Sequence, residues 1–275
     1  MGKGAAAGKA LIYVEGTWRD DGAKVVSPKS HAMWLSSVVF DGARALGGVV
    51  PDLLPHCART VRSARILGLE PQHSGEEIAD LAREGIARFG PDAELYVCPM
   101  FFAEGGFVNP DPSTTRFALS VYESPLPPPS GFSATLTRFR RPGVDMAPTE
   151  AKASCLYPNV ARGLREVAEK GFDMGVVLDP DGHVAEFSYA NLFYAKDGQV
   201  FTPVPNGTFL DGITRQRVIG LLRDTGTEVI ETKVAYDDLA GADEVFATGN
   251  YAKVFPCSRL DGRVLPQGPL YRKAR

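Results

Sequence analysis

The sequence lacks long apolar runs and a strong charge of either sign. No stretch approaches the ~20 apolar residues that cross a membrane, and the start, MGKGAAAGKALIYVEG, has no apolar core long enough for a signal peptide. We therefore expect a cytoplasmic protein with no membrane partner. A net charge of −3 over 275 residues gives no electrostatic reason to bind nucleic acid.

Paired cysteines and metal-ligand motifs are also missing. The four cysteines are widely separated: Cys57, Cys98, Cys155 and Cys257. No CxxC pair occurs, so we expect reduced thiols rather than a zinc knuckle or a disulfide framework. The four histidines are equally scattered: His31, His56, His73 and His183. Without HExxH spacing or a GxSxG motif, metal catalysis and serine hydrolysis are poor candidates, and no metal site is predicted.

A proline-rich stretch divides the chain. The sequence ESPLPPPSG contains three consecutive prolines, which stiffen the backbone and withhold amide donors from a sheet. We interpret residues 123–131 as a linker between an N-terminal α/β domain, 1–122, and a C-terminal α/β domain, 132–275. The chain is long enough for each domain to have its own core.

Hydrophobic patterning predicts a mixture of helices and strands. Ser74 and Glu77 form a capping box that opens a helix. Further helices are predicted at 56–69, 158–170 and 214–226. Strands are predicted where aromatic and branched residues gather: 11–16, 94–102, 116–122, 132–139, 173–179, 183–188, 191–198 and 227–234.

One lysine and one glutamate carry the strongest chemical signal. Lys152 lies among small residues in EAKASCLYPN, and Glu186 lies in HVAEFSYANLF. A lysine amine can hold an aldehyde cofactor as a Schiff base, and a carboxylate can keep a pyridine nitrogen protonated. Taken singly, each has an ordinary alternative as a surface lysine or an exposed strand carboxylate. Together they indicate pyridoxal phosphate chemistry.

Donors for a phosphate group are offered by three segments. In HCARTVRSA, the guanidinium of Arg59 suits bidentate phosphate binding. In FLDGITRQRV, Gly212 permits a sharp turn, so that the amides of Ile213 and Thr214 at a helix start can point at an anion. The third segment is DEVFATGNYAKVFP. Each is ordinary alone, since a helix-surface arginine or a glycine turn needs no phosphate.

In their order and approximate spacing, these motifs resemble the class IV aminotransferases, most closely the branched-chain aminotransferase branch. The resemblance implies an α/β (α+β), two-domain fold type IV architecture like that of D-amino acid aminotransferase, with a C-terminal domain that carries the cofactor lysine. It implies pyridoxal 5'-phosphate as cofactor, a homodimer, and ping-pong transamination through an aldimine of Lys152, which then acts as the base.

The resemblance also assigns roles to cofactor-binding residues. Tyr157 would hydrogen-bond the ring oxygen, Glu186 would pair with the pyridinium, and Leu210 would lie against the ring. Gly249 and Asn250 fall where many family members have Gly-Thr-Ala, with the threonine hydroxyl on the phosphate. Asparagine can still donate a hydrogen bond there, but this is a departure from the family pattern.

The substrate pocket departs from the family pattern as well. SSVVFDGARALGG resembles the family's SVFEGIRxYxG, so Phe40 would form an apolar wall, while Leu35 stands where a tyrosine is common. Tyr96 and Cys98 lie in the segment where branched-chain enzymes commonly read YIRP. Cys98 takes the place of the arginine of that segment, whose positive charge helps to hold a distal carboxylate. Tyr251 completes the predicted pocket. We expect a preference for hydrophobic donors, either branched-chain amino acids or (R)-amines.

Several alternatives remain. Arg44 or Lys253 could supply a substitute carboxylate anchor, which would keep glutamate as a donor. An aminodeoxychorismate lyase-type enzyme shares this lysine and glutamate but eliminates pyruvate, and a D-amino acid transaminase shares the fold. A protein that only binds the cofactor is disfavoured, because both Lys152 and Glu186 are present.

Overall fold

The chain folds as two compact units. The computed structural model describes residues 8–275. The first unit extends to Leu126 and also takes in Glu150–Cys155, and the second unit comprises Pro127–Thr149 and Leu156–Arg275. The proline-rich stretch 123–131 spans the division, although its first residue still belongs to a strand of the first unit. Among the described residues, no helix is long and apolar enough to cross a membrane.

The location of the lysine segment differs from expectation. The sequence predicts Lys152 within the C-terminal domain 132–275, but Glu150–Cys155 belongs to the first unit. Ala153 forms an isolated antiparallel bridge with Val39, and the backbone N–H of Phe40 donates to the carbonyl of Lys152 at 3.1 Å. The expectation was wrong at this point because these backbone partners lie far earlier in the chain, and local composition carries no sign of them.

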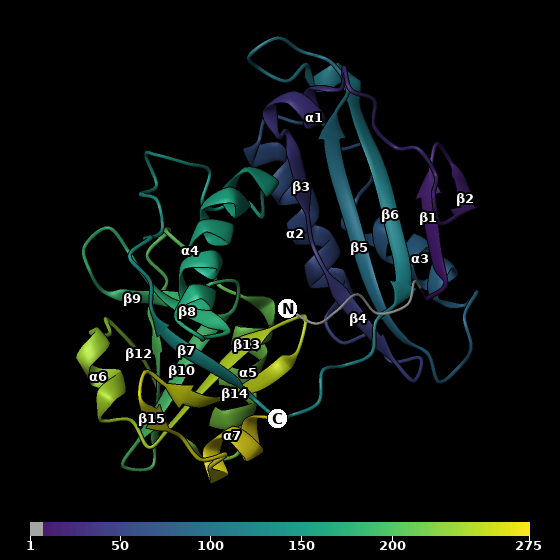
Figure 1. The fold of residues 1–275 in the computed structure, drawn as a ribbon. Coiled ribbons are helices and arrows are strands. Elements are labelled where there is room, and N and C mark those ends of the chain that lie inside the picture. Colours follow the sequence, from purple (N-terminus) through teal and green to yellow (C-terminus); the bar gives the residue numbers. More distant parts are fainter. Residues whose placement is uncertain (1–7) are drawn as a thin grey trace. The chain divides into compact units, whose positions relative to one another are not determined.

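The first unit is built on an antiparallel sheet. Its strand order is β2-β1-β6-β5-β3, with β4 also paired to β5 (Figure 1). The strands are β1 (Ala10–Val14), β2 (Thr17–Asp20), β3 (Val38–Phe40), β4 (Ala43–Leu46), β5 (Glu94–Ala103) and β6 (Thr115–Glu123). The helices are α1 (His31–Leu35), α2 (Leu53–Ile66) and α3 (Gly75–Ile86), with a 3₁₀ turn at Pro112–Thr114.

One face of this sheet carries the core of the first unit. Alternate residues of β5, including Leu95, Val97 and Phe101, are buried in one cluster with apolar residues of α2 and α3. Ser74 caps α3 as predicted, because its hydroxyl accepts from the N–H of Glu77 at 3.2 Å while the Glu77 carboxylate accepts from the N–H of Ser74 at 2.7 Å. Tyr96, Cys98 and Met100 therefore lie on the opposite face of the strand.

A proline explains why two short strands pair with one long strand. β3 pairs with residues 100–102 of β5 and β4 with residues 94–97, so the interruption falls opposite Cys98 and Pro99. Proline has no N–H to donate and is unusual inside a sheet. The backbone N–H of Asp41 donates to the Pro99 carbonyl at 3.1 Å. The chain turns a corner here, at Asp41 and Gly42.

The second unit contains a mixed sheet with the order β12-β11-β10-β13-β14-β7-β8-β9, and β15 pairs with β14. The strands are β7 (Phe132–Leu136), β8 (Met174–Leu178), β9 (Val184–Phe187), β10 (Asn191–Lys196), β11 (Gln199–Pro203), β12 (Val229–Thr232), β13 (Glu244–Gly249), β14 (Lys253–Leu260) and β15 (Arg263–Val264). The helices are α4 (Tyr157–Glu169), α5 (Ile213–Asp224), α6 (Tyr236–Ala240) and α7 (Pro269–Ala274), and a 3₁₀ turn, Ser154–Leu156, precedes α4.

Both faces of the central strands in this unit are buried. Along β10, Leu192 and Tyr194 belong to one apolar cluster, whereas Phe193 and Ala195 belong to another that includes residues of α5 and α7. Most predicted elements occur close to their expected positions, but α1, α6, α7, β2 to β4, β11 and β13 to β15 were not predicted as elements. All four cysteines are unpaired, in agreement with the expected thiols, and only Cys155 is exposed.

Candidate active site

Lys152 is held by its backbone on both sides. Its N–H donates to the hydroxyl of Ser63 on α2 at 3.1 Å, and its carbonyl accepts from Phe40 at 3.1 Å. The ammonium lies 5.0 Å from the centroid of the Phe40 ring. A lysine side chain is long and flexible, so a backbone fixed at both ends limits where its amine can reach. This geometry suits an amine that must return to one reacting atom.

A buried carboxylate orients the predicted phosphate arginine. Asp41 is fully buried and receives two hydrogen bonds from Arg59, Nε to Oδ2 at 2.6 Å and Nη2 to Oδ1 at 2.9 Å. Nδ1 of His56 lies 2.7 Å from Oδ1 of the same carboxylate, and the N–H of Gly42 donates to Oδ1 at 2.7 Å. Arg59, one helical turn after His56 on α2, is therefore locked in one orientation.

The charge state of Asp41 follows from these contacts. Burial by itself would raise the pKa of this carboxyl, but the charge and hydrogen bonds of Arg59, with those of His56, outweigh burial and hold the pKa well below its usual range. Asp41 is thus a permanent anion at physiological pH. It partly balances the cationic surroundings that a phosphate would meet.

The sheet face opposite α2 and α3 is aromatic beside Cys98. Tyr96 pairs with Tyr122, their ring centroids 5.5 Å apart, and Cys98 pairs with Ser120. Cys98 is 7% exposed, and burial, with the charge of Asp41, raises the pKa of its thiol to about 12. The thiol is therefore neutral at physiological pH and adds no charge to this face.

Gly42 completes the corner beside this face. A Cβ atom on Gly42 would lie 2.1 Å from the hydroxyl oxygen of Tyr96, far inside van der Waals contact. The absence of a side chain at this position therefore lets the Tyr96 ring lie against the backbone.

Glu186 occupies a buried position in the second unit. It lies on β9 and is 8% exposed, so the alternative of an exposed strand carboxylate does not apply. Oε1 of Glu186 lies 3.5 Å from Nε of Arg141, which also donates to the carbonyl of Thr208 at 2.8 Å. The guanidinium gives the buried carboxylate a partner of opposite charge. This carboxylate can accept a hydrogen bond from a protonated ring nitrogen.

Asn191 fixes the turn before α5. Its Nδ2 donates to the Leu210 carbonyl at 2.9 Å, and its Oδ1 would lie 2.0 Å from a Cβ on Gly212. Gly212 therefore accepts no side chain here. No side chain caps α5, so the amides of its first turn, at Ile213 and Thr214, are available to an anion.

The end of β13 lies beside this turn. Thr248 pairs with Asn191 across the sheet, and Gly249 and Asn250 follow Thr248. Among the described residues, Oγ1 of Thr248 and Nδ2 of Asn250 are buried atoms without a hydrogen-bond partner. Buried polar atoms in proteins are nearly always paired, so two such atoms at one strand end are suited to a partner from outside the chain.

The other predicted residues have less informative surroundings. Tyr157 is the first residue of α4 and is half-buried. Leu35 ends α1 with 48% of its surface exposed, and Tyr251 is 53% exposed. The predicted residues divide between the units. Lys152, Arg59, Leu35, Phe40, Tyr96 and Cys98 belong to the first, and Tyr157, Glu186, Leu210, Gly212, Ile213, Thr214, Gly249, Asn250 and Tyr251 to the second.

Comparison with known proteins identifies the family. Residues 38–260 match the model of the amino-transferase class IV family, and the chain belongs to this family. It is a pyridoxal phosphate-dependent aminotransferase with a mixed α/β fold of type IV.

Individual relatives agree with this assignment. The chain is 30% identical to a branched-chain-amino-acid aminotransferase of Pseudomonas aeruginosa, with 94% of this chain and 87% of that protein covered. It is 49% identical to an aminotransferase from Brucella abortus bound to pyridoxal phosphate, with a TM-score of 0.96 over 97% of this chain and 96% of the other. A branched-chain aminotransferase from the archaeon Thermoproteus uzoniensis is 29% identical, with a TM-score of 0.89 over 97% and 92% of the two chains.

The side chains present fit this cofactor. The second unit offers a buried carboxylate for a ring nitrogen at Glu186 and unpartnered buried polar atoms at Thr248 and Asn250, next to an uncapped helix start. The first unit offers an amine at Lys152 and an oriented guanidinium at Arg59. An amine, a carboxylate and several anion donors are the groups that pyridoxal phosphate requires.

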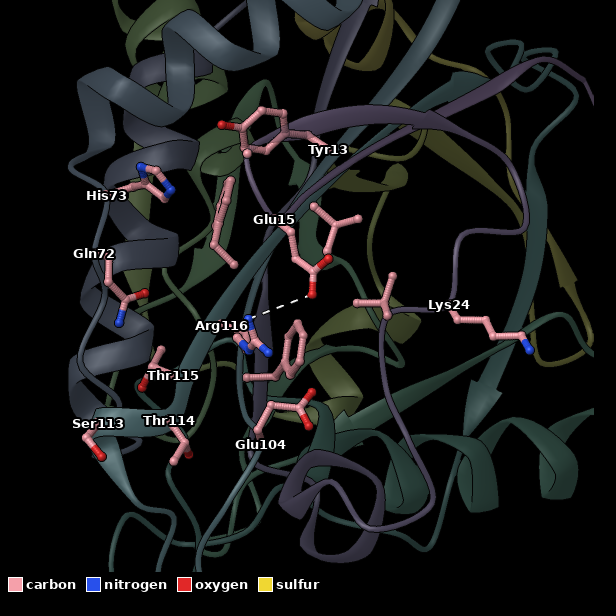
Figure 2. Close-up of a pocket in the computed structure, with 15 residues that line it drawn as sticks. Tyr13, Glu15, Lys24, Gln72, His73, Glu104, Ser113, Thr114, Thr115 and Arg116 are labelled. Carbon is pink, nitrogen blue, oxygen red and sulfur yellow. Dashed lines mark ion pairs between the residues drawn. The ribbon is translucent and has the colours of Figure 1, made fainter.

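A separate hollow in the first unit does not match this chemistry. Figure 2 shows this hollow, with a volume of about 610 Å³, and none of the predicted site residues lines it. Its charged groups include Arg116 and Glu15, which lie 3.9 Å apart and are each more than half exposed. Such a pair is screened by water and contributes little.

The turn between β8 and β9 places three metal-ligand residue types together. Ligand atoms of Asp179, Asp181 and His183 lie within 4.8 Å of one another. Both oxygens of Asp179 already accept hydrogen bonds, from the backbone N–H of His183 at 2.8 Å and from Nδ2 of Asn206 at 2.9 Å. These bonds build the turn, and we assign no ion to it.

Sequence reasoning missed the residues that orient the site. Asp41, Ser63, Arg141 and Asn191 each touch a predicted residue or its backbone. Asp41 and Ser63 lie inside motifs that were recognised, FDGAR and HCARTVRSA, and Asn191 follows Glu186 closely. The polar residues of these motifs that had no predicted role were the sequence feature that could have pointed to them.

We predict that Asp41→Asn destabilises the protein by about 3–5 kcal/mol at pH 7, because it leaves the buried charge of Arg59 without its partner. Since the folded-state pKa of Asp41 is lowered, its contribution is complete above the unfolded pKa of ~3.9 and is lost as the pH falls below it. Urea unfolding from pH 7 to pH 3 would therefore show the difference between the two proteins shrinking. Equal stabilities at pH 7 would contradict this assignment.

Proposed function

We propose that this enzyme transfers the amino group of a hydrophobic donor, a branched-chain amino acid or an (R)-amine, to a 2-oxo acid. The observation that carries the proposal is Cys98. Its neutral, buried thiol lies on an aromatic sheet face at the position where branched-chain enzymes commonly carry an arginine. A distal carboxylate beside Cys98 would lose its hydration without gaining a cation from that position.

The chain's own residues supply binding and proton transfer. Bound pyridoxal phosphate supplies an aldehyde and an electron-withdrawing ring. Nζ of Lys152 would hold this cofactor and, as a free amine, would move the proton between the donor carbon and the cofactor. Glu186 would accept a hydrogen bond from the ring nitrogen, and Arg141, whose Nε lies 3.5 Å from Oε1 of Glu186, helps to hold this carboxylate in place. Tyr157 hydrogen-bonds the ring oxygen.

The two substitute anchors for a carboxylate are both engaged elsewhere. Arg44 is fully buried, donates to the backbone carbonyl of Ser124 and lies over the Tyr96 ring at 5.6 Å. Nζ of Lys253 donates to Oδ1 of Asn250 at 2.8 Å. Neither cation therefore supports glutamate as the preferred donor. This favours hydrophobic donors without a second carboxylate.

The relatives support the branched-chain interpretation in particular. Several of them are branched-chain-amino-acid aminotransferases, and the structure of the Thermoproteus uzoniensis enzyme was determined with norvaline. The alternative is a lyase that releases pyruvate or a D-amino acid transaminase on the same fold. The SSVVFDGARALGG motif and the tyrosine after Lys152 favour transamination.

We further propose a homodimer. Around α1 and the loop after β5, five apolar side chains form an exposed patch: Met33, Trp34, Leu35, Phe107 and Val108. His31 ties the two segments together, because its N–H donates to the carbonyl of Glu104 and its Nε2 lies 3.3 Å from the carbonyl of Val108. Trp34 is 74% exposed and Phe107 88% exposed. Large apolar side chains gathered in this way are typical of a protein interface.

The choice of donor is tested by visible absorbance. We expect L-leucine to convert the absorbance band of the cofactor in the purified holoenzyme, because the apolar face accommodates its side chain. Conversion by (R)-1-phenylethylamine instead would assign the enzyme to (R)-amines. A band that neither compound changes, together with pyruvate release without an amino acceptor, would establish the lyase alternative.

The role of Cys98 is tested by kinetics. We expect kcat/KM for L-leucine to exceed that for L-glutamate by about tenfold or more, since one hydrogen bond to a charged group is worth roughly 1.5–3 kcal/mol. Cys98→Arg should raise glutamate relative to leucine, whereas the control Cys98→Ser keeps the size of the side chain and adds no charge. Equal rates with the two donors in the native enzyme would sink the proposal.

Association is tested by sedimentation velocity of the holoenzyme. We expect a dimer that Trp34→Asp weakens, because the variant places a charge in the apolar patch. Val264→Asp is the matched control, since Val264 is 80% exposed in the second unit and lies outside the patch. A monomeric native enzyme, or equal effects of the two variants, would refute this interface.

A further inference from the structure

The amide of Asn250 has one end paired and one end unpaired. Its Oδ1 accepts a hydrogen bond from Nζ of Lys253 at 2.8 Å. Its Nδ2 is buried and has no partner among residues 8–275. A buried amide nitrogen without an acceptor is costly. An acceptor from outside the chain, such as an oxygen of a bound ligand, would satisfy this nitrogen.

Lys253 determines which way the amide faces. The oxygen and the nitrogen of an asparagine amide have nearly the same shape. The surrounding hydrogen bonds therefore determine which of the two faces a given neighbour. An ammonium group has only donors, so Oδ1 and not Nδ2 must face it. The tight connection between β13 and β14 places Lys253 opposite Gly249, in a left-handed backbone conformation with φ of 58°. The lysine thus reaches back to the residue after its strand partner.

The unpaired end belongs to a group of anion donors. Oγ1 of Thr248, a residue that is 0% exposed, is also buried without a partner in the described part of the chain. Asn191, which pairs with Thr248, contacts Gly212 at the uncapped start of α5. The two unpartnered buried side-chain atoms therefore belong to residues 248 and 250, and the strand partner of Thr248 contacts the start of α5. A dianionic phosphate would satisfy them together.

We propose that Lys253 is a positioning residue for the cofactor phosphate: its ammonium fixes the Asn250 amide so that Nδ2 donates a hydrogen bond to a phosphate oxygen. The threonine hydroxyl common at this position in the family rotates to suit its acceptor and needs no such lock, whereas an amide presents either a donor or an acceptor. The asparagine and the lysine therefore work as a pair. The proposal rests on the cofactor and is independent of the amino donor.

The test uses variants that change the direction of the amide. Lys253→Met removes the hydrogen bond that orients the Asn250 amide. Lys253→Glu reverses the orientation, because a carboxylate would accept from Nδ2 and turn Oδ1 toward the phosphate. We expect the apoenzyme's affinity for pyridoxal phosphate to fall by about tenfold in Lys253→Met, as for one lost hydrogen bond to a charged group, and further in Lys253→Glu. Pyridoxal, which has no phosphate, should bind all three proteins equally.

A second substitution separates orientation from charge. Asn250→Thr supplies a hydroxyl whose direction does not depend on Lys253, so Lys253→Glu should cost much less affinity in the Asn250→Thr background than in the native one. Asn250→Asp, which places an oxygen at both ends, should lose as much affinity as Lys253→Glu. Lys233→Met removes an exposed lysine of the same unit and is the control for net charge.

The readouts do not require turnover. Dissociation constants for pyridoxal phosphate and inorganic phosphate come from calorimetry on the full-length apoenzyme, with far-UV circular dichroism to verify folding, and the ³¹P chemical shift of the holoenzyme reports the hydrogen bonding of the phosphate. Native affinity in Lys253→Met would overturn the proposal. Equal losses for Lys253→Glu with and without Asn250→Thr would also overturn it, because they would show a purely electrostatic effect.

Discussion

The anchoring of the Lys152 backbone to the first unit is the constraint on which the site depends. Ser63 on α2 accepts from the lysine N–H, and Phe40 on β3 donates to its carbonyl. The same helix carries Arg59, locked by Asp41 from the corner after β3. One helix and one strand end therefore fix both the backbone of the lysine predicted to bond the cofactor and the arginine predicted to bind its phosphate. A shift of α2 would move both groups together.

The second unit orients its groups through side chains that do not themselves carry the chemistry. Arg141 stands beside Glu186, Asn191 supports the turn at Gly212, and Lys253 donates a hydrogen bond to Asn250. Such support is what holds reactive groups within the small tolerance that catalysis allows. The site is thus determined by a larger set of residues than those that meet the cofactor.

Local patterns predicted the parts of this protein that local forces determine. The capping box at Ser74 and strands such as 94–102 follow from neighbouring residues, and the structure contains them. The placement of the lysine segment in the C-terminal domain was wrong, because its pairing with Val39 joins distant parts of the chain. The hydrogen bonds between Asp41 and Arg59 also join residues that are separated in the chain, so local sequence patterns do not predict them. The family motifs led to predictions for the reactive residues but not for the residues that contact and orient them.

The corner at Gly42 has a consequence for how the specificity of this enzyme can change over evolution. Since the Tyr96 hydroxyl occupies the space that any side chain at position 42 would need, substitution there displaces an aromatic ring before it alters the pocket. We then expect variation in substrate range to arise from the side chains of the predicted pocket residues, such as Phe40 and Cys98. The backbone at this corner is therefore expected to stay unchanged. New specificities are expected to come from the side chains around it.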